Sequence, residues 1–211
     1  MAARPLRIAI LVIVAFAAGL ILARLLTPER IDPPETERAT VLPEPRPLPP
    51  LDLVDQDGRS LPADFFASHW TLVFFGFTQC PDICPTTLAT LAQTRRQLAD
   101  LPEAARPRVL LVSVDPERDT PERLAAYVRF FDPAFLGATG SLESIAATAA
   151  AFGIPYAKVT MPEGGYTMDH GSGIFVVGPT GGIVAYLSAP HDAGVIARDF
   201  RKLLAWQAST R

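Results

Sequence analysis

The sequence predicts an α/β fold, on three observations. Residues 71–77 and 108–114 are apolar runs of the length that buried strands have. Each run is followed by a segment in which apolar residues recur at helical spacing, at 86–98 and at 121–131. Buried strands that alternate with helices are typical of a sheet covered by helices. The only two cysteines of the chain, Cys80 and Cys84, lie at the first of these strand-to-helix junctions.

The N-terminal segment, residues 1–26, is predicted to be a membrane anchor. Residues 8–23 are uncharged and apolar, and residues 6–26 would span about 31 Å as a helix, with arginines at both ends that can reach the interface. A cleaved signal peptide is the alternative, because small residues occur at suitable spacing at 15–18. The apolar run continues past that point, which favours an uncleaved single-pass helix with the following domain exported.

Residues 27–50 contain eight prolines and are predicted to form an extended linker that holds the domain off the membrane. The domain itself is expected at 51–211. Residues 51–61 are interpreted as a short hairpin, with Asp57-Gly58 at its turn.

The remaining elements follow from periodicity and capping residues. Pro121 is the expected first residue of its helix, with Thr120 as the N-cap. The others are a short strand at 135–139, an alanine-rich helix at 141–153, a hairpin at 174–177 and 183–187, and a closing helix at 195–208 entered at Asp192. Strand, helix, strand, helix, hairpin and helix around a cysteine pair is the order of a thioredoxin-like fold, here with an N-terminal β-hairpin addition.

Cys80 and Cys84 are candidates for two kinds of chemistry. A helix N-terminus favours negative charge, so thiolates are expected there, and thiolates either exchange with disulfides or bind a soft metal. Three residues separate the cysteines, one more than in thioredoxin-type motifs. That spacing permits both a disulfide and convergence on one ion, so the pair alone leaves the choice open.

His170 shifts the balance toward a metal. It lies in a glycine-rich stretch, 164–173, which precedes the hairpin and faces the cysteine motif in thioredoxin-like folds. A cis-proline ordinarily occupies that place, but no proline occurs between Pro162 and Pro179. Two sulfurs and an imidazole suit Cu(I), and Cu(II) with an added oxygen ligand.

Other polar residues receive smaller roles. Asp119 and Asp169 are candidates to contact the ligands without binding the metal themselves. His69 is interpreted as a surface residue and His191 as a residue at a helix start. The net charge is −3 and no basic stripe occurs, so nucleic acid is not an expected partner.

Four motifs together resemble the SCO/SenC family of membrane-anchored, thioredoxin-like copper carriers. They are FGFT at 75–78, CPDICP at 80–85, DPERDTP at 115–121 and YTMDH at 166–170. The resemblance covers residues 51–205. The family often has serine after the Asp-His pair, where this chain has Gly171; that departure concerns loop flexibility and leaves the ligands unchanged.

The resemblance implies delivery of copper to the binuclear copper centre in subunit II of cytochrome c oxidase, with Cys80, Cys84 and His170 as ligands. Other periplasmic copper carriers are further expected partners. The composition and short anchor suggest the bacterial inner membrane, with the domain in the periplasm. The main alternative is a thiol–disulfide reductase that keeps the oxidase's copper-site cysteines reduced. A peroxidase and a copper or redox sensor would use the same cysteines.

Overall fold

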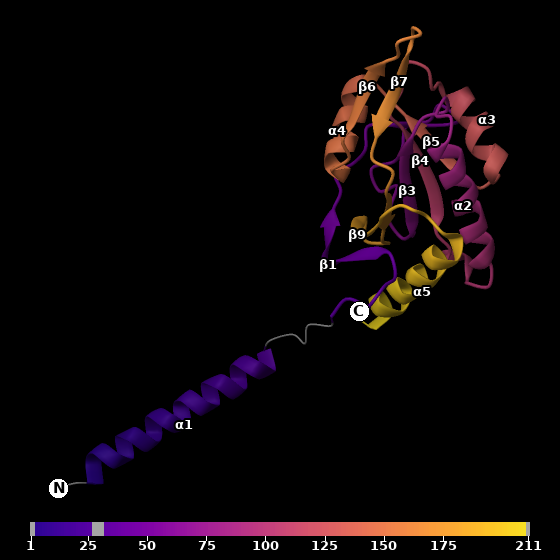
Figure 1. The fold of residues 1–211 in the computed structure, drawn as a ribbon. Coiled ribbons are helices and arrows are strands. Elements are labelled where there is room, and N and C mark those ends of the chain that lie inside the picture. The colour runs from indigo at the N-terminus through magenta and orange to yellow at the C-terminus, as the bar shows by residue number, and fades with distance from the viewer. Residues whose placement is uncertain (1–2, 27–31, 210–211) are drawn as a thin grey trace. The chain divides into compact units, whose positions relative to one another are not determined.

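A seven-stranded sheet with Cys80 and Cys84 just beyond one end of its central strand organises the domain (Figure 1). The computed structural model describes residues 3–26 and 32–209. The strand order is β1-β9-β8-β3-β4-β5-β2. The bounds are β1 (Ala39–Pro47), β2 (Val54–Asp55), β3 (Thr71–Gly76), β4 (Arg108–Ser113), β5 (Leu136–Thr139), β8 (Ile174–Val177) and β9 (Gly182–Leu187).

The predicted α/β order is confirmed at the centre of this sheet. β3, β4 and β5 run parallel, and the β8–β9 hairpin pairs antiparallel with β3. Every residue of β3 is buried, because helices cover both faces of the sheet. Beyond the carboxyl end of β3 the chain continues in a loop, and loops of this kind line the edge of the sheet at which ligands bind in α/β folds.

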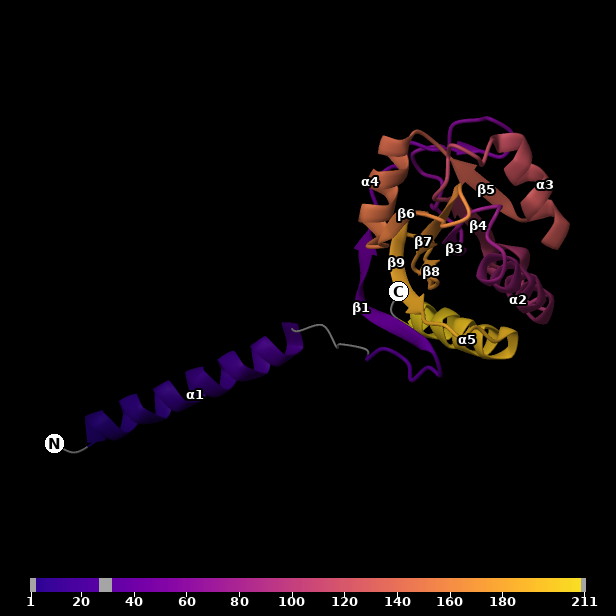
Figure 2. The same cartoon turned by 45° about the horizontal axis from the view of Figure 1, so that its top comes forward.

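Helices α2 (Ile83–Gln97), α3 (Pro121–Phe131) and α5 (Ala193–Ser209) cover one face, and α4 (Leu142–Phe152) covers the other (Figure 2). A short 3-10 helix spans Glu103–Ala105. Successive side chains of β3 point to opposite faces of the sheet, so β3 contributes to the core on both sides. Phe75 meets the ring of Phe152 from α4 at 5.2 Å between centroids, and the neighbouring Phe74 points to the opposite face.

The capping residues act as the sequence predicts. The Thr120 side chain accepts from the Arg123 N–H at the start of α3, and Asp192 accepts from Val195 at the start of α5. Gly153 ends α4 with a φ of 72°, a conformation that glycine adopts without strain. Helix α2 begins three residues earlier than predicted, so Cys84 lies inside its first turn.

The predicted linker boundary is wrong. The compact domain begins at Pro33, and residues 39–47 are the edge strand β1, paired antiparallel with β9. The buried Asp199 carboxylate accepts three backbone N–H groups, from Glu37, Arg38 and Ala39, at 2.8–2.9 Å. A fragment that starts at residue 51 would lose this strand and leave Asp199 without those partners.

The predicted hairpin at 51–61 forms only in part. Asp55 and Arg59 close a tight turn through a 2.8 Å bond, and Gly58 takes a φ of 76°. However, Val54 meets Ser60 in a single bridge, while Val54–Asp55 pairs as β2 with β5 at the outer edge of the main sheet.

A second sheet was not expected from the sequence. β6 (Tyr156–Thr160) and β7 (Tyr166–His170) form an antiparallel two-stranded sheet of their own, drawn in orange in Figure 1. His170, placed in a loop by the sequence, is the last residue of β7.

The segment before residue 33 contains one described helix, α1 (Ala3–Leu26). Of the helices in residues 3–26 and 32–209, none combines the length and apolar character that a membrane crossing requires. The predicted anchor is therefore not confirmed and stays a prediction; residues 1–2, and 27–31 of the predicted linker, lie outside the described residues.

Candidate metal centre

The two cysteines lie at the carboxyl end of β3, as the sequence predicts. Cys80 belongs to the loop after the strand, and its N–H donates to the Phe77 carbonyl oxygen at 3.3 Å. Cys84 is fully buried, whereas Cys80 is partly exposed. The Cys84 N–H donates to the Cys80 sulfur at 3.4 Å. The start of α2 thus holds both sulfurs together, with Cys80 on the solvent side.

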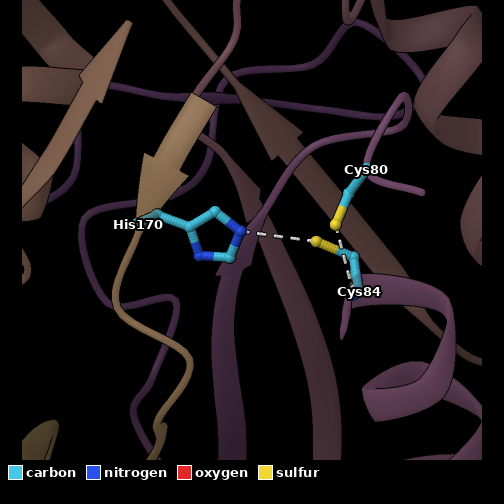
Figure 3. Close-up of side chains that lie close together, drawn as sticks. All are labelled: Cys80, Cys84 and His170. Carbon is cyan, nitrogen blue, oxygen red and sulfur yellow. Dashed lines mark hydrogen bonds between the residues drawn. The ribbon is translucent and has the colours of Figure 1, made fainter. Parts of the chain in front are cut away.

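His170 approaches the cysteines from the separate hairpin, and Figure 3 shows its ring directed at the Cys84 sulfur. Its Nε2 lies 3.4 Å from that sulfur, and its Nδ1 lies 3.0 Å from the Gly171 carbonyl oxygen. Because a carbonyl oxygen only accepts, Nδ1 carries the proton and Nε2 presents its lone pair. The rings of Phe74 and Phe77 pack edge-on against the imidazole, at 6.0 and 5.9 Å between centroids.

These three side chains form a candidate metal-ligating group, called the metal-ligating group below. The two sulfurs and one imidazole nitrogen all lie within 4.8 Å of one another. Across the described ranges 3–26 and 32–209, no other set of three His, Cys, Asp or Glu side chains converges in this way. Thiolate sulfur and imidazole nitrogen suit a soft or borderline ion such as Cu(I), whereas Mg²⁺ and Ca²⁺ prefer oxygen. The donor set therefore fits the predicted copper.

Burial sets the protonation of the two innermost donors. It raises the pKa of the Cys84 thiol well above its usual range, and the contact with Cys80 raises that pKa further. The thiolate expected at this helix start is therefore not favoured at Cys84, because lost solvation outweighs the helix N-terminus. Burial lowers the pKa of His170, so the imidazole is neutral at neutral pH. A metal must displace the Cys84 proton on binding.

Asp119 supports the cysteine loop, the kind of role expected for it. Its carboxylate is fully buried and accepts from the Thr78 N–H at 3.0 Å, the Thr78 hydroxyl at 2.6 Å and the Ser113 hydroxyl at 2.7 Å. Burial raises the pKa of this carboxyl, against the lowering effect of the hydrogen bonds from Thr78 and Ser113. Asp119 thereby ties the start of the cysteine loop to the end of β4.

Asp169 has a different position from the one expected. It is exposed and pairs with Ala157 in the register of the hairpin, one residue before His170 on β7. Successive side chains of a strand point to opposite faces, so Asp169 does not share the face of His170. Its charge raises the pKa of His170, but less than burial lowers it.

The two other histidines do not join the site. The His191 Nε2 lies 2.7 Å from the Ser172 carbonyl oxygen, so His191 holds the loop after His170, and His69 is exposed. Among the described residues, neither belongs to the metal-ligating group.

Gly76, the last residue of β3, is a functional position that the sequence did not indicate. A Cβ there would lie 2.9 Å from the Cys84 sulfur and 3.1 Å from a ring carbon of Phe74. At a contact under 3.0 Å one of the two atoms must move. Because glycine has no side chain, residue 76 leaves the space that the Cys84 sulfur occupies. Its φ is not in the left-handed region, which is why no turn rule signals it.

We expect Gly76→Ala to weaken copper binding by about tenfold, because the added methyl group displaces a ligand atom. Competition with a chromophoric Cu(I) chelator measures this. Gly137→Ala is a matched control, since the added Cβ of this β5 residue would crowd Leu124 of α3 at 3.2 Å without touching a cysteine. Equal copper affinities for the two variants would contradict the role given to Gly76.

Comparison with known proteins shows similarity to a family that includes copper-binding members. The SCO1/SenC family model matches residues 43–205. A Stutzerimonas stutzeri protein named for copper binding is 38% identical over 71% of this chain and 73% of its own length. The mitochondrial SCO2 homolog of Bos taurus is 38% identical over 74% of this chain, but the match spans only 59% of that protein. The crystal structure of Arabidopsis thaliana ScoI with copper bound is similar with a TM-score of 0.70 and 30% identity, covering 75% of this chain and 98% of that one.

Proposed function

The chain belongs to the SCO1/SenC family, and on this basis we propose that it is a copper metallochaperone. One observation carries the proposal: Cys80, Cys84 and His170 bring two sulfurs and a neutral imidazole nitrogen within 4.8 Å of one another. These donors come from two segments 86 residues apart. The copper-bound Arabidopsis relative has the same fold, which supports copper as the ion.

Copper is here the cargo. Two thiolates are sufficient to hold Cu(I), and the imidazole adds the nitrogen that Cu(II) prefers. Cys80 is partly exposed, so a thiol of an acceptor protein can approach the metal from that side and exchange with its ligands. A structural site enclosed by four protein ligands would not offer this access.

We infer that the acceptor is the binuclear copper centre of cytochrome c oxidase subunit II. Support comes from the family resemblance of the four sequence motifs. The matched region is only part of the longer mitochondrial relatives, so the acceptor is a proposal for this domain. Other periplasmic copper carriers are further proposed partners.

We also propose that the chain is anchored in a bacterial inner membrane with the domain in the periplasm. Support comes from the apolar residues 8–23 and their flanking arginines. Extraction of membranes at alkaline pH tests the anchor, since release of the full-length chain into the soluble fraction would argue against it.

A thiol–disulfide reductase is the second candidate, because both cysteines are free and their sulfurs lie close together. Cys80 would be the attacking residue, since the raised pKa of the buried Cys84 disfavours its thiolate. That activity does not require His170, whereas the proposed binding of Cu(II) does.

A transfer experiment distinguishes the two functions. The Cu(I)-loaded domain, residues 33–211, is mixed with a soluble subunit II domain whose copper-site cysteines are reduced. We expect copper to move to the acceptor in the wild-type reaction and not in the Cys80→Ser reaction, followed by the metal content of the separated proteins. Reduction of a disulfide-bonded acceptor by metal-free protein, without copper transfer, would favour the reductase.

A further inference from the structure

His170 reaches the cysteines from a hairpin that is not hydrogen-bonded into the main sheet. Among the described strands, β6 and β7 pair with each other and with no third strand. The hydrogen bonds of the main sheet fix the positions of Cys80 and Cys84 through β3 and α2. They do not fix the position of His170, the third proposed ligand. Side-chain contacts must place the hairpin relative to the cysteine loop.

Arg118 makes such contacts with three segments at once. It lies between β4 and α3, and its Nε pairs with the buried Asp115 of the same loop. Its Nη1 donates to the Gln79 side-chain oxygen at 3.2 Å, next to Cys80, and to the Tyr166 carbonyl oxygen at 3.0 Å, at the start of β7. One guanidinium thus links its own loop, the cysteine loop and the strand that ends in His170.

Tyr166 extends this link along β7. Its ring stacks on the Arg118 guanidinium, with 3.8 Å from the central carbon to the ring centroid. Its hydroxyl donates to the Asp115 carboxylate at 2.8 Å. On the outer side, the Lys158 Nζ of β6 lies 3.9 Å from the same ring centroid and pairs with Glu117. Both strands of the hairpin are therefore held to the loop at 115–118.

We propose that Arg118 is a positioning residue for the imidazole ligand: by holding β7 against the cysteine loop, it keeps the Nε2 atom of His170 within reach of the metal. This inference rests on the proposed copper function. It assigns Arg118 no contact with the metal. Loss of Arg118 would free the hairpin and leave the two sulfurs in place. It would therefore weaken the binding of Cu(II), which needs the nitrogen ligand, more than the binding of Cu(I), which two thiolates can hold.

The planar fork of arginine matters here. Asp115 accepts from the Nε of Arg118, and Gln79 and Tyr166 both accept from its Nη1. The face of the same rigid group stacks on an aromatic ring, an arrangement that a lysine ammonium does not reproduce. Arg118→Lys retains the positive charge and much of the stem. It therefore separates the geometry of the link from its charge.

The test is a double-mutant cycle between Arg118→Gln and His170→Ala in residues 33–211, with separate Cu(II) and Cu(I) titrations. We expect Arg118→Gln to lower Cu(II) affinity by about tenfold or more and Cu(I) affinity by less than about threefold. In the His170→Ala background the same change should cause no further loss of Cu(II) affinity, because the residue it positions is absent. Arg129→Gln, which removes an exposed ion pair with Asp57, is the control and should change neither affinity.

Two results would overturn the inference while leaving the copper function intact: unchanged Cu(II) affinity in Arg118→Gln, or an equal loss with and without His170. If His170→Ala itself leaves Cu(II) binding unchanged, the ligand assignment fails and the inference fails with it. Should circular dichroism show that Arg118→Gln is unfolded, Arg118→Lys replaces it in the cycle, with the same selective loss expected.

Discussion

Replacing Cys84 with serine should lower the affinity for Cu(I) by about a thousandfold or more. The change removes the innermost soft donor and leaves one sulfur and one nitrogen, while the hydroxyl that replaces the thiol is a hard oxygen. Cys84 is fully buried with its sulfur 3.4 Å from the His170 Nε2, so no other side chain can take its place without a rearrangement of the start of α2. Cys80→Ser should have an effect of the same order.

Competition with a Cu(I)-specific chelator measures these affinities. Met161→Leu is a suitable control, because it removes an exposed soft sulfur of the hairpin that does not belong to the metal-ligating group. A Cys84→Ser affinity within tenfold of wild type would mean that Cu(I) is held elsewhere. A large loss in Met161→Leu would add a thioether to the ligand set.

Replacing His170 with alanine should lower Cu(II) affinity by about a hundredfold or more, and Cu(I) affinity far less. Cu(I) is satisfied by two thiolates, but Cu(II) loses its only nitrogen ligand from this group. The neutral His170, with its Nδ1 proton on the Gly171 carbonyl oxygen, offers Nε2 without first releasing a proton. The variant therefore separates the two oxidation states.

Visible absorption measures this second prediction, because a thiolate bound to Cu(II) gives a charge-transfer band. We expect the band to be lost or strongly weakened in His170→Ala and unchanged in His69→Ala, which removes an exposed histidine outside the site. A His170→Ala protein with the wild-type band and Cu(II) affinity would rule out the imidazole ligand.

The sequence was sufficient to predict the centre of the fold and the three proposed ligands. The runs at 71–77 and 108–114 are apolar enough to be recognised alone, and Thr120, Pro121 and Gly153 mark helix ends by local chemistry. The convergence of His170 on the cysteines followed from the topology of a thioredoxin-like fold, in which that segment faces the junction.

The edge strand β1 could not be recognised in the same way. Its partner, β9, lies about 140 residues later, and prolines within residues 39–47 argue against a strand in any local rule. Proline is tolerated there because β1 is at the edge of the sheet, where one side of the strand needs no partner. The Ala39-Thr40-Val41 start was the only local signal.

The supporting residues of the site were missed for a related reason. Gly76 matters because a sulfur from the next element packs against its backbone, and Arg118 matters because it touches two loops and a strand. Those contacts exist only in the folded chain. The same holds for the raised pKa of Cys84, where burial by tertiary packing outweighs a helix N-terminus that the sequence could predict.

X-ray absorption at the copper edge, on residues 33–211 loaded with one Cu(II) per chain, tests the central claim most directly. The arrangement of Cys80, Cys84 and His170 predicts two sulfur neighbours and one imidazole nitrogen, with the nitrogen shell absent in His170→Ala. A wild-type spectrum with sulfur neighbours alone, or one that His170→Ala leaves unchanged, would contradict the three-ligand site.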